Sequence, residues 1–264
     1  MIPIYLWELR RRKMFTVWWS IGISALIGMT VASFLAIKDQ VDEFNKAFNG
    51  LSESAGSFFG GSDFFSPIGY LSSQIYYIIL PLLVIILAVT LASSLMSKDE
   101  TDETIELTLA RPVSRSQILF GKAIAGVTIV LIVCVTSYIV TAVGAQLVGL
   151  QIDQKNLLIT HLLSFAFSAS FGAISFALIA ASRSLRPIAG VVAIVFSFGG
   201  YIVSSLGGFV DGLKPIANAV PYHYYNTSDL LSGKVSSELL IYIGVTYVLV
   251  VVVMWLGYNR RDIG

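Results

Sequence analysis

Six long apolar stretches run through the 264-residue chain, and polar or turn-rich segments separate each one from the next. A helix needs about 20 mainly apolar residues to cross the hydrocarbon core of a bilayer, and every stretch reaches that length. The pattern therefore predicts an all-α integral membrane protein with six transmembrane helices in a single domain, residues 1–264. The predicted spans are residues 15–37, 70–96, 119–150, 157–181, 187–206 and 239–258.

The composition agrees with a membrane protein and narrows its chemistry. Hydrophobic residues make up 56% of the chain and charged residues only 12%, with a mean hydropathy of +0.80, whereas soluble domains carry about 25% charged residues. No basic stripe of the kind that binds nucleic acid is present. The single cysteine, Cys134, excludes an intramolecular disulfide and a cysteine metal cluster. We expect no metal site and no cofactor bound by this chain.

Ionisable residues avoid the predicted spans. Apart from Lys122, near the start of the third span, Asp, Glu, Lys and Arg occur only at the span ends. Such a group at mid-bilayer costs about 2.5–3.5 kcal/mol on insertion scales, so carriers driven by protons or sodium through a buried carboxylate show it in their sequence. This class of carrier is disfavoured, and we expect the energy for transport to come from outside the bilayer.

The basic residues predict the orientation, because loops rich in Lys and Arg stay in the cytoplasm. With the N-terminus inside, twelve basic residues, including every arginine, lie on the inner side, and five lysines lie on the outer side. An even number of spans also returns the C-terminus to the cytoplasm. The outer lysines are Lys38, Lys46, Lys155, Lys214 and Lys234.

The inner segment between the second and third spans, residues 97–121, is too polar to enter lipid. Four acidic residues near its start favour a helix N-terminus there, and Pro112 ends that element. Ser114 is the predicted N-cap of a second helix that continues into the third span. Two interpretations stay open: a docking surface for a cytoplasmic protein, or a solvated charged loop.

This inner segment resembles the corresponding loop of ABC-2 type permeases, the membrane subunits of ATP-binding-cassette exporters. In that family a coupling helix at this place receives the ATP-binding subunit, so the resemblance implies a coupling role. Glu103 departs from the pattern, because the family commonly has glycine before the threonine, and the local turn is expected to differ. The implied coupling residues are Glu100, Thr104, Glu106, Arg111, Pro112, Val113, Ser114, Arg115, Gly121 and Lys122.

Two outer segments are also similar to this family. Residues 38–69 combine an amphipathic stretch with a glycine-rich turn, and residues 220–233 resemble the short extracellular re-entrant helices that precede the sixth span. His161 is predicted near the outer membrane surface, and Tyr222, Tyr224 and Tyr225 are predicted in the aromatic belt at the lipid headgroups.

The N-terminus and two small-residue faces each allow two interpretations. Residues 2–13 are predicted to form an interfacial helix along the inner leaflet, with a plain topogenic anchor as the alternative. Small residues at every fourth position let helices approach closely in lipid, either within one subunit or at a dimer interface. These residues are Ser24, Gly28 and Ala32, flanked by Ser20 and Ala36, in the first span, and Gly200, Ser204 and Gly208 in the fifth.

The sequence contains no complete P-loop. This motif needs glycine, four residues and then Gly-Lys-Ser/Thr, but Gly121-Lys122 and Gly233-Lys234 are followed by alanine and valine. We therefore expect a transport subunit that is not itself an enzyme. The resemblance implies that ATP and Mg²⁺ are bound by a separate ABC ATPase subunit.

Two functions follow as expectations. The first is a plasma-membrane permease subunit that exports an unidentified amphipathic or lipophilic substrate, together with its ATPase and a second permease chain in a homo- or heterodimer. The alternative is a membrane scaffold or signalling protein that docks a cytoplasmic partner without transport.

Overall fold

The computed structural model describes residues 1–41, 66–101 and 114–260, and the regular elements in these ranges are all helical. Six helices are long and apolar enough to cross a membrane, which confirms the predicted number. Each begins one to four residues before the predicted span. They are Lys13–Ile37 (α2), Pro67–Met96 (α5, the π-helical turn η2 and most of α6), Arg115–Leu147 (α8), Gln154–Ala181 (α9), Arg186–Leu206 (α10) and Ser237–Arg260 (α13).

Shorter elements flank these helices. Helix α1 precedes α2 and ends at Arg11, because the backbone angles of the next residue, Arg12 (φ −106°, ψ 12°), are not helical. The bounds of α6 and the shorter elements are Ile2–Arg11 (α1), Lys38–Gln40 (η1), Pro67–Leu71 (α5), Ser72–Tyr76 (η2), Ile79–Thr101 (α6), Arg183–Leu185 (η3), Asp211–Leu213 (η4), Lys214–Ala217 (α11), Pro221–Tyr224 (η5) and Thr227–Leu231 (α12).

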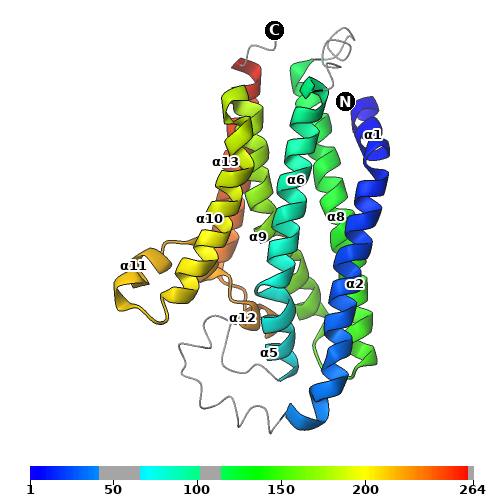
Figure 1. The fold of residues 1–264 in the computed structure, drawn as a ribbon, viewed down its shortest axis with the longest axis vertical. Coiled ribbons are helices and arrows are strands. Elements are labelled where there is room, and N and C mark those ends of the chain that lie inside the picture. Colours follow the sequence, from blue (N-terminus) through cyan, green and yellow to red (C-terminus); the bar gives the residue numbers. More distant parts are fainter. Residues whose placement is uncertain (42–65, 102–113, 261–264) are drawn as a thin grey trace.

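The long helices lie side by side along the long axis of the molecule, and the start of α1 and the end of α13 lie at the same end of the bundle (Figure 1). We call this the terminal end. The short helices α11 and α12 lie toward the opposite end (Figure 1). An even number of spans brings the chain back to the end of the bundle where it began. This arrangement agrees with the predicted separation of basic residues between the two ends.

Helix α9 forms the centre of the bundle. It packs against α6, α8, α10 and α13, and its span is the most buried of the six. Close van der Waals contact drives helix association in lipid, so small residues are favoured where helices touch. A Cβ atom at Gly172 of α9 would lie 2.3 Å from the Cβ atom of Ala88 in α6. The two backbones therefore meet at this glycine.

His161, predicted near the outer membrane surface, is covered by protein and is not exposed at an interface; its depth in the membrane stays a prediction. His161 is fully buried in α9, and its two ring nitrogens each lie 3.0 Å from a hydroxyl oxygen, one of Tyr76 and one of Ser137. These partners are 85 and 24 positions away in the sequence. The hydrophobic pattern could not reveal them, because only the folded bundle brings the three side chains together.

Tyr222 and Tyr225 are also buried, at 6% and 1% exposure, so their assignment to the aromatic belt at the lipid headgroups is wrong. The ring of Tyr225 stacks on Phe167 with 4.3 Å between centroids. Its hydroxyl oxygen lies 2.7 Å from Ser164 Oγ and 2.9 Å from the carbonyl oxygen of Tyr76. The segment that contains η5 and α12 thus packs onto α9 and the π-helical turn η2. Its depth in the membrane, and with it the re-entrant assignment, stays a prediction.

Candidate functional site

The end of α6 and the beginning of α8, between which the predicted coupling segment runs in the sequence, lie at the terminal end of the bundle (Figure 1). Glu100 lies in the last turn of α6, but its side chain is outside the described part of the structure. Also outside the described residues are Thr104, Glu106, Arg111, Pro112 and Val113. The described part of the site is therefore its two arms: the end of α6 and the beginning of α8.

The beginning of α8 confirms the N-cap predicted at Ser114. The side chain of Ser114 accepts a hydrogen bond from the backbone N–H of Gln117 (3.2 Å), and Gln117 Oε1 accepts one from the backbone N–H of Ser114 (3.1 Å). This capping box satisfies two amide groups that would otherwise lack partners. Helix α8 therefore has a defined start directly after the loop, and it presents the exposed Arg115 in its first turn.

Gly121 lies in the interface between α8 and α1, and its neighbour Lys122 is buried. A Cβ atom at Gly121 would lie 3.1 Å from Ile4 Cγ2 and 3.4 Å from the carbonyl oxygen of Met1. Lys122 is 6% exposed. The predicted coupling residues thus differ in placement: Ser114 and Arg115 face outward, whereas Gly121 and Lys122 are covered within the chain.

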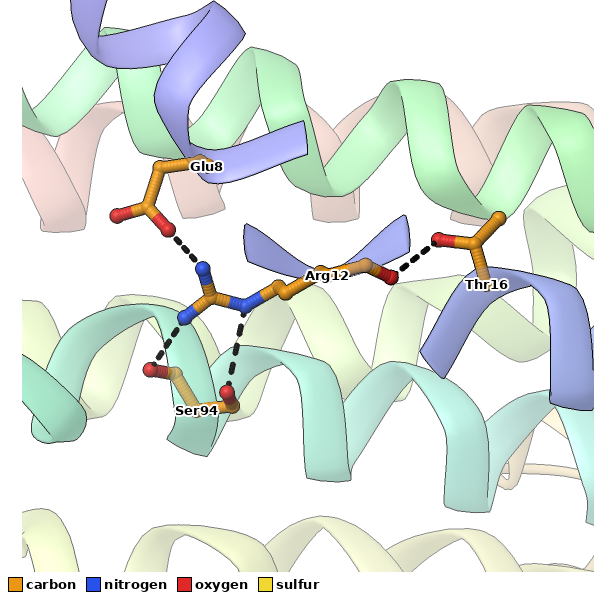
Figure 2. Close-up of polar contacts among 4 residues, drawn as sticks. All are labelled: Glu8, Arg12, Thr16 and Ser94. Carbon is orange, nitrogen blue, oxygen red and sulfur yellow. Dashed lines mark hydrogen bonds and ion pairs between the residues drawn. The ribbon is translucent and has the colours of Figure 1, made fainter. Parts of the chain in front are cut away.

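Hydrogen bonds from Arg12, which also forms a buried ion pair with Glu8, connect α1 to α6, the other arm of the loop (Figure 2). Glu8 is fully buried and Arg12 is 5% exposed, and the Nη1 atom of Arg12 contacts Glu8 Oε2. Arg12 also donates to Ser94 of α6, through Nη2 to the carbonyl oxygen (2.7 Å) and through Nε to the hydroxyl (3.3 Å). Thr16 in α2 donates from Oγ1 to the carbonyl oxygen of Arg12 (3.0 Å). We call Glu8, Arg12, Thr16 and Ser94 the Arg12 cluster.

Arg12 is well suited to this position because its guanidinium group offers five donors in a planar fork. Removing an ion pair from water is costly, and further hydrogen bonds to the charged groups reduce this cost. In the cluster Ser94 accepts two hydrogen bonds from Arg12, so the charged Arg12 is held in place by α6. The other carboxylate oxygen, Glu8 Oε1, is buried and has no hydrogen-bond partner among the described residues.

Helix α1 therefore contacts both arms of the predicted coupling segment. On one side Arg12 donates hydrogen bonds to Ser94, which lies two turns before the end of α6 at Thr101. On the other side Ile4 packs on Gly121, two turns into α8. A displacement of either arm would change contacts that α1 makes, and α1 leads directly into α2 through Arg12.

The sequence analysis missed Glu8 and Ser94 as members of this site. Glu8 carried a signal, because it is the only acidic residue among the first 38 positions and it precedes Arg12 by four residues. Such a spacing places the two side chains on one helix face. Ser94 carried no comparable signal, since its contribution is largely a backbone carbonyl oxygen.

The two small-residue faces are partly occupied within the chain. The Cβ position of Gly28 lies 3.5 Å from Val140 of α8, and that of Gly200 lies 3.7 Å from the ring of Tyr222. Ser24 and Ser204 are half-buried, whereas Ala32 and Gly208 are exposed. The exposed members remain available to another subunit, and their role in a dimer interface stays a prediction.

Comparison with known proteins identifies the family. The model of a family described as "ABC-2 family transporter protein" matches residues 4–262, which is nearly the whole chain. No curated protein and no solved structure matches the chain. The matched region includes all six apolar helices, the Arg12 cluster and both arms of the predicted coupling segment. Because the match extends over this whole architecture, the chain belongs to the ABC-2 family of membrane transport proteins.

Proposed function

We propose that this protein is the permease subunit of an ATP-binding-cassette exporter. In this proposal it lies in the plasma membrane with both termini in the cytoplasm, and it pairs with a second permease chain. A separate ABC ATPase subunit binds ATP and Mg²⁺. The family match over residues 4–262 is the observation that carries the proposal.

The proposed route of coupling starts at the segment between α6 and α8. Closure of the ATPase subunits would displace this segment, and Arg115 is exposed next to it for contact. A ligand shifts a conformational equilibrium only when it binds the two states differently, so the ATPase must contact the segment differently before and after closure.

Helix α1 would then transmit the displacement of one arm to the other, because it contacts both α6 and α8. The Arg12 cluster joins it to α6, and Gly121 joins it to α8. Both joints are buried, and a packed core transmits small shifts instead of absorbing them. In this role Gly121, beside the buried Lys122, acts by positioning α1, while Ser114 and Arg115 present the start of α8 to the partner.

ATP hydrolysis in a purified complex tests this proposal. The tagged chain is purified with its bound partners, reconstituted into liposomes and assayed for ATP turnover. We expect a nucleotide-binding subunit in the complex, and we expect Glu106→Ala combined with Arg115→Ala to lower its ATP hydrolysis strongly. A charge-matched control, Lys155→Ala combined with Glu238→Ala, changes exposed residues at the opposite end and should leave hydrolysis unchanged.

Each outcome decides between the two functions. Loss of hydrolysis in the first double variant alone supports the permease. Unchanged hydrolysis in both double variants contradicts the coupling role of this segment. A stable complex whose partner binds no nucleotide would favour the scaffold function instead.

A further inference from the structure

A cavity of about 620 Å³ lies between α6, α8, α9 and α13. Small residues form its floor, among them Ala166, Ala169 and Ala173 of α9, which recur at intervals of three and four and so share one helix face. Larger aliphatic side chains form the walls, for example Val130 of α8 and Val250 of α13. The cavity exists because the side chains of these α9 residues are too short to fill the space between α8 and α13.

The cavity offers almost nothing to water. The hydroxyl of Tyr247 already donates to the carbonyl oxygen of Ala166 (3.0 Å). The other lining side chains are aliphatic or phenyl groups, apart from the thiol of the buried Cys134 and the thioether of Met254. A buried water needs two to four polar partners, and apolar cavities remain dry without them.

The walls of the cavity continue into the surface that faces lipid. Val127 and Leu131 of α8 are 57% and 50% exposed, Val251 of α13 is 45% exposed, and all three line the cavity. At the terminal end, Ser116 Oγ of α8 donates to Asn259 Oδ1 of α13 (3.4 Å). The two helices are therefore bridged at that end, and the apolar opening between them faces sideways.

Along α8 the cavity has about the length of one leaflet. Its α8 wall runs from Ala123 to Cys134, which at about 1.5 Å per residue is roughly 16 Å, about half of a hydrocarbon core of roughly 30 Å. On α6 and α13 the lining residues, 88–95 and 247–254, run from near the middle of each helix toward the terminal end, and on α9 they run from Leu162 to Phe176, across the middle of that helix. A flexible apolar chain lying along the helices would match this length and depth.

We propose that this cavity binds one acyl chain of a phospholipid from the leaflet at the terminal end of the bundle. The chain enters sideways between α8 and α13 and lies over the alanines of α9. Lipid is the occupant because it is the apolar molecule that surrounds this opening, and the cavity walls are continuous with the surface that contacts lipid. The inference requires only that the bundle spans a membrane, so it does not depend on the proposed export function.

Photo-crosslinking in lipid nanodiscs tests this inference. The full-length chain is reconstituted with a phospholipid that carries a diazirine in the middle of one acyl chain, and the crosslinked peptides are mapped by mass spectrometry. We expect residues 123–134 and 247–254 to be labelled more densely than the exposed face of α2. Equal labelling of the cavity peptides and α2 would overturn the proposal.

Filling the cavity provides the matched comparison. Ala169→Phe and Ala173→Phe, made singly, should lower the labelling of the cavity peptides several-fold while leaving that of α2 unchanged. Ala25→Phe adds the same side chain on the exposed face of α2 and should leave cavity labelling unchanged. Unchanged labelling in both filled variants would contradict the assignment.

A second copy of the chain is the competing occupant. With Cys134→Ala as the background, Leu131→Cys and Val251→Cys test it by oxidative crosslinking. Inter-chain disulfides at these positions, together with absent lipid labelling, would show that a subunit covers the cavity. The native protein alone already decides whether lipid enters, so the test does not depend on any variant folding.

Discussion

Arg12 lies between α1 and α2, and its guanidinium group contacts both Glu8 and Ser94 in a site that solvent barely reaches. Replacing it with methionine leaves the carboxylate of Glu8 buried without its counter-charge. Removing one partner of a buried ion pair typically costs about 3–5 kcal/mol. We expect Arg12→Met to lower the free energy of unfolding by this amount, measured by denaturation in mixed micelles.

Two further variants distinguish the effect of losing the buried ion pair from the effect of losing one positive charge. Arg10→Met removes the same charge from the same helix at an exposed position and should change stability by less than about 0.5 kcal/mol. Glu8→Leu combined with Arg12→Met removes both charges, and should recover much of the lost stability because apolar pairs replace buried ion pairs at little cost. A double variant as unstable as Arg12→Met would show that the charge on Glu8 is not the cause.

Tyr76 provides a second test at the residue scale, because its hydroxyl contacts a ring nitrogen of the fully buried His161. Tyr76→Phe should lower the free energy of unfolding by about 1–3 kcal/mol, since a buried polar atom loses its partner. The measurement is again denaturation in micelles. Tyr138→Phe is the control: Tyr138 packs on the same imidazole ring at 5.7 Å between centroids, so a comparable loss there would exclude the hydrogen bond as the explanation.

The contact between α1 and α8 depends on the absence of a side chain at Gly121. Gly121→Leu would push Ile4 and the backbone of Met1 away from α8. Overpacking of this kind typically costs about 1–3 kcal/mol. We expect the variant to be less stable and a cysteine placed at Ile4 to react faster with maleimide, in a Cys134→Ala background.

Gly22 is the matched control for Gly121. It lies on α2, and a Cβ atom there would have no neighbour within 4 Å. Gly22→Leu should leave the labelling rate at position 4 unchanged. Equal rates in Gly121→Leu and the parent protein would contradict the proposed joint between α1 and α8.

The helices themselves were predictable because membrane crossing imposes a length and a hydrophobicity that a sequence displays directly. The cap at Ser114 was predictable for a similar reason, since capping depends on residues close in sequence. The π-helical turn from Ser72 to Tyr76 was not predicted. Its residues continue an apolar stretch, and periodicity at this length does not separate a π-helical turn from an α-helical one.

The bundle as a whole predicts a definite sidedness. If both termini are cytoplasmic, a cysteine at Ser114 should react with a membrane-impermeant maleimide only in inside-out vesicles. A cysteine at Lys234, which is exposed in the loop before α13, should react in intact cells. Both variants use a Cys134→Ala background, and gel-shift labelling measures the reaction. Labelling of Ser114→Cys in intact cells would reverse the orientation and remove the coupling segment from the ATPase.

The sequence by itself determined the number of helices, their approximate bounds and the separation of basic residues between the two ends. These properties follow from transfer free energies of single side chains, which add along the chain whatever their neighbours are. The tertiary structure decided which polar residues lose contact with solvent. Glu8 and Arg12 were expected at an interface, and His161 at the outer surface, yet all three are buried. Their burial depends on α6 and α8 supplying partners such as Ser94 and Ser137, and only the packing of helices distant in sequence brings these groups within hydrogen-bonding distance.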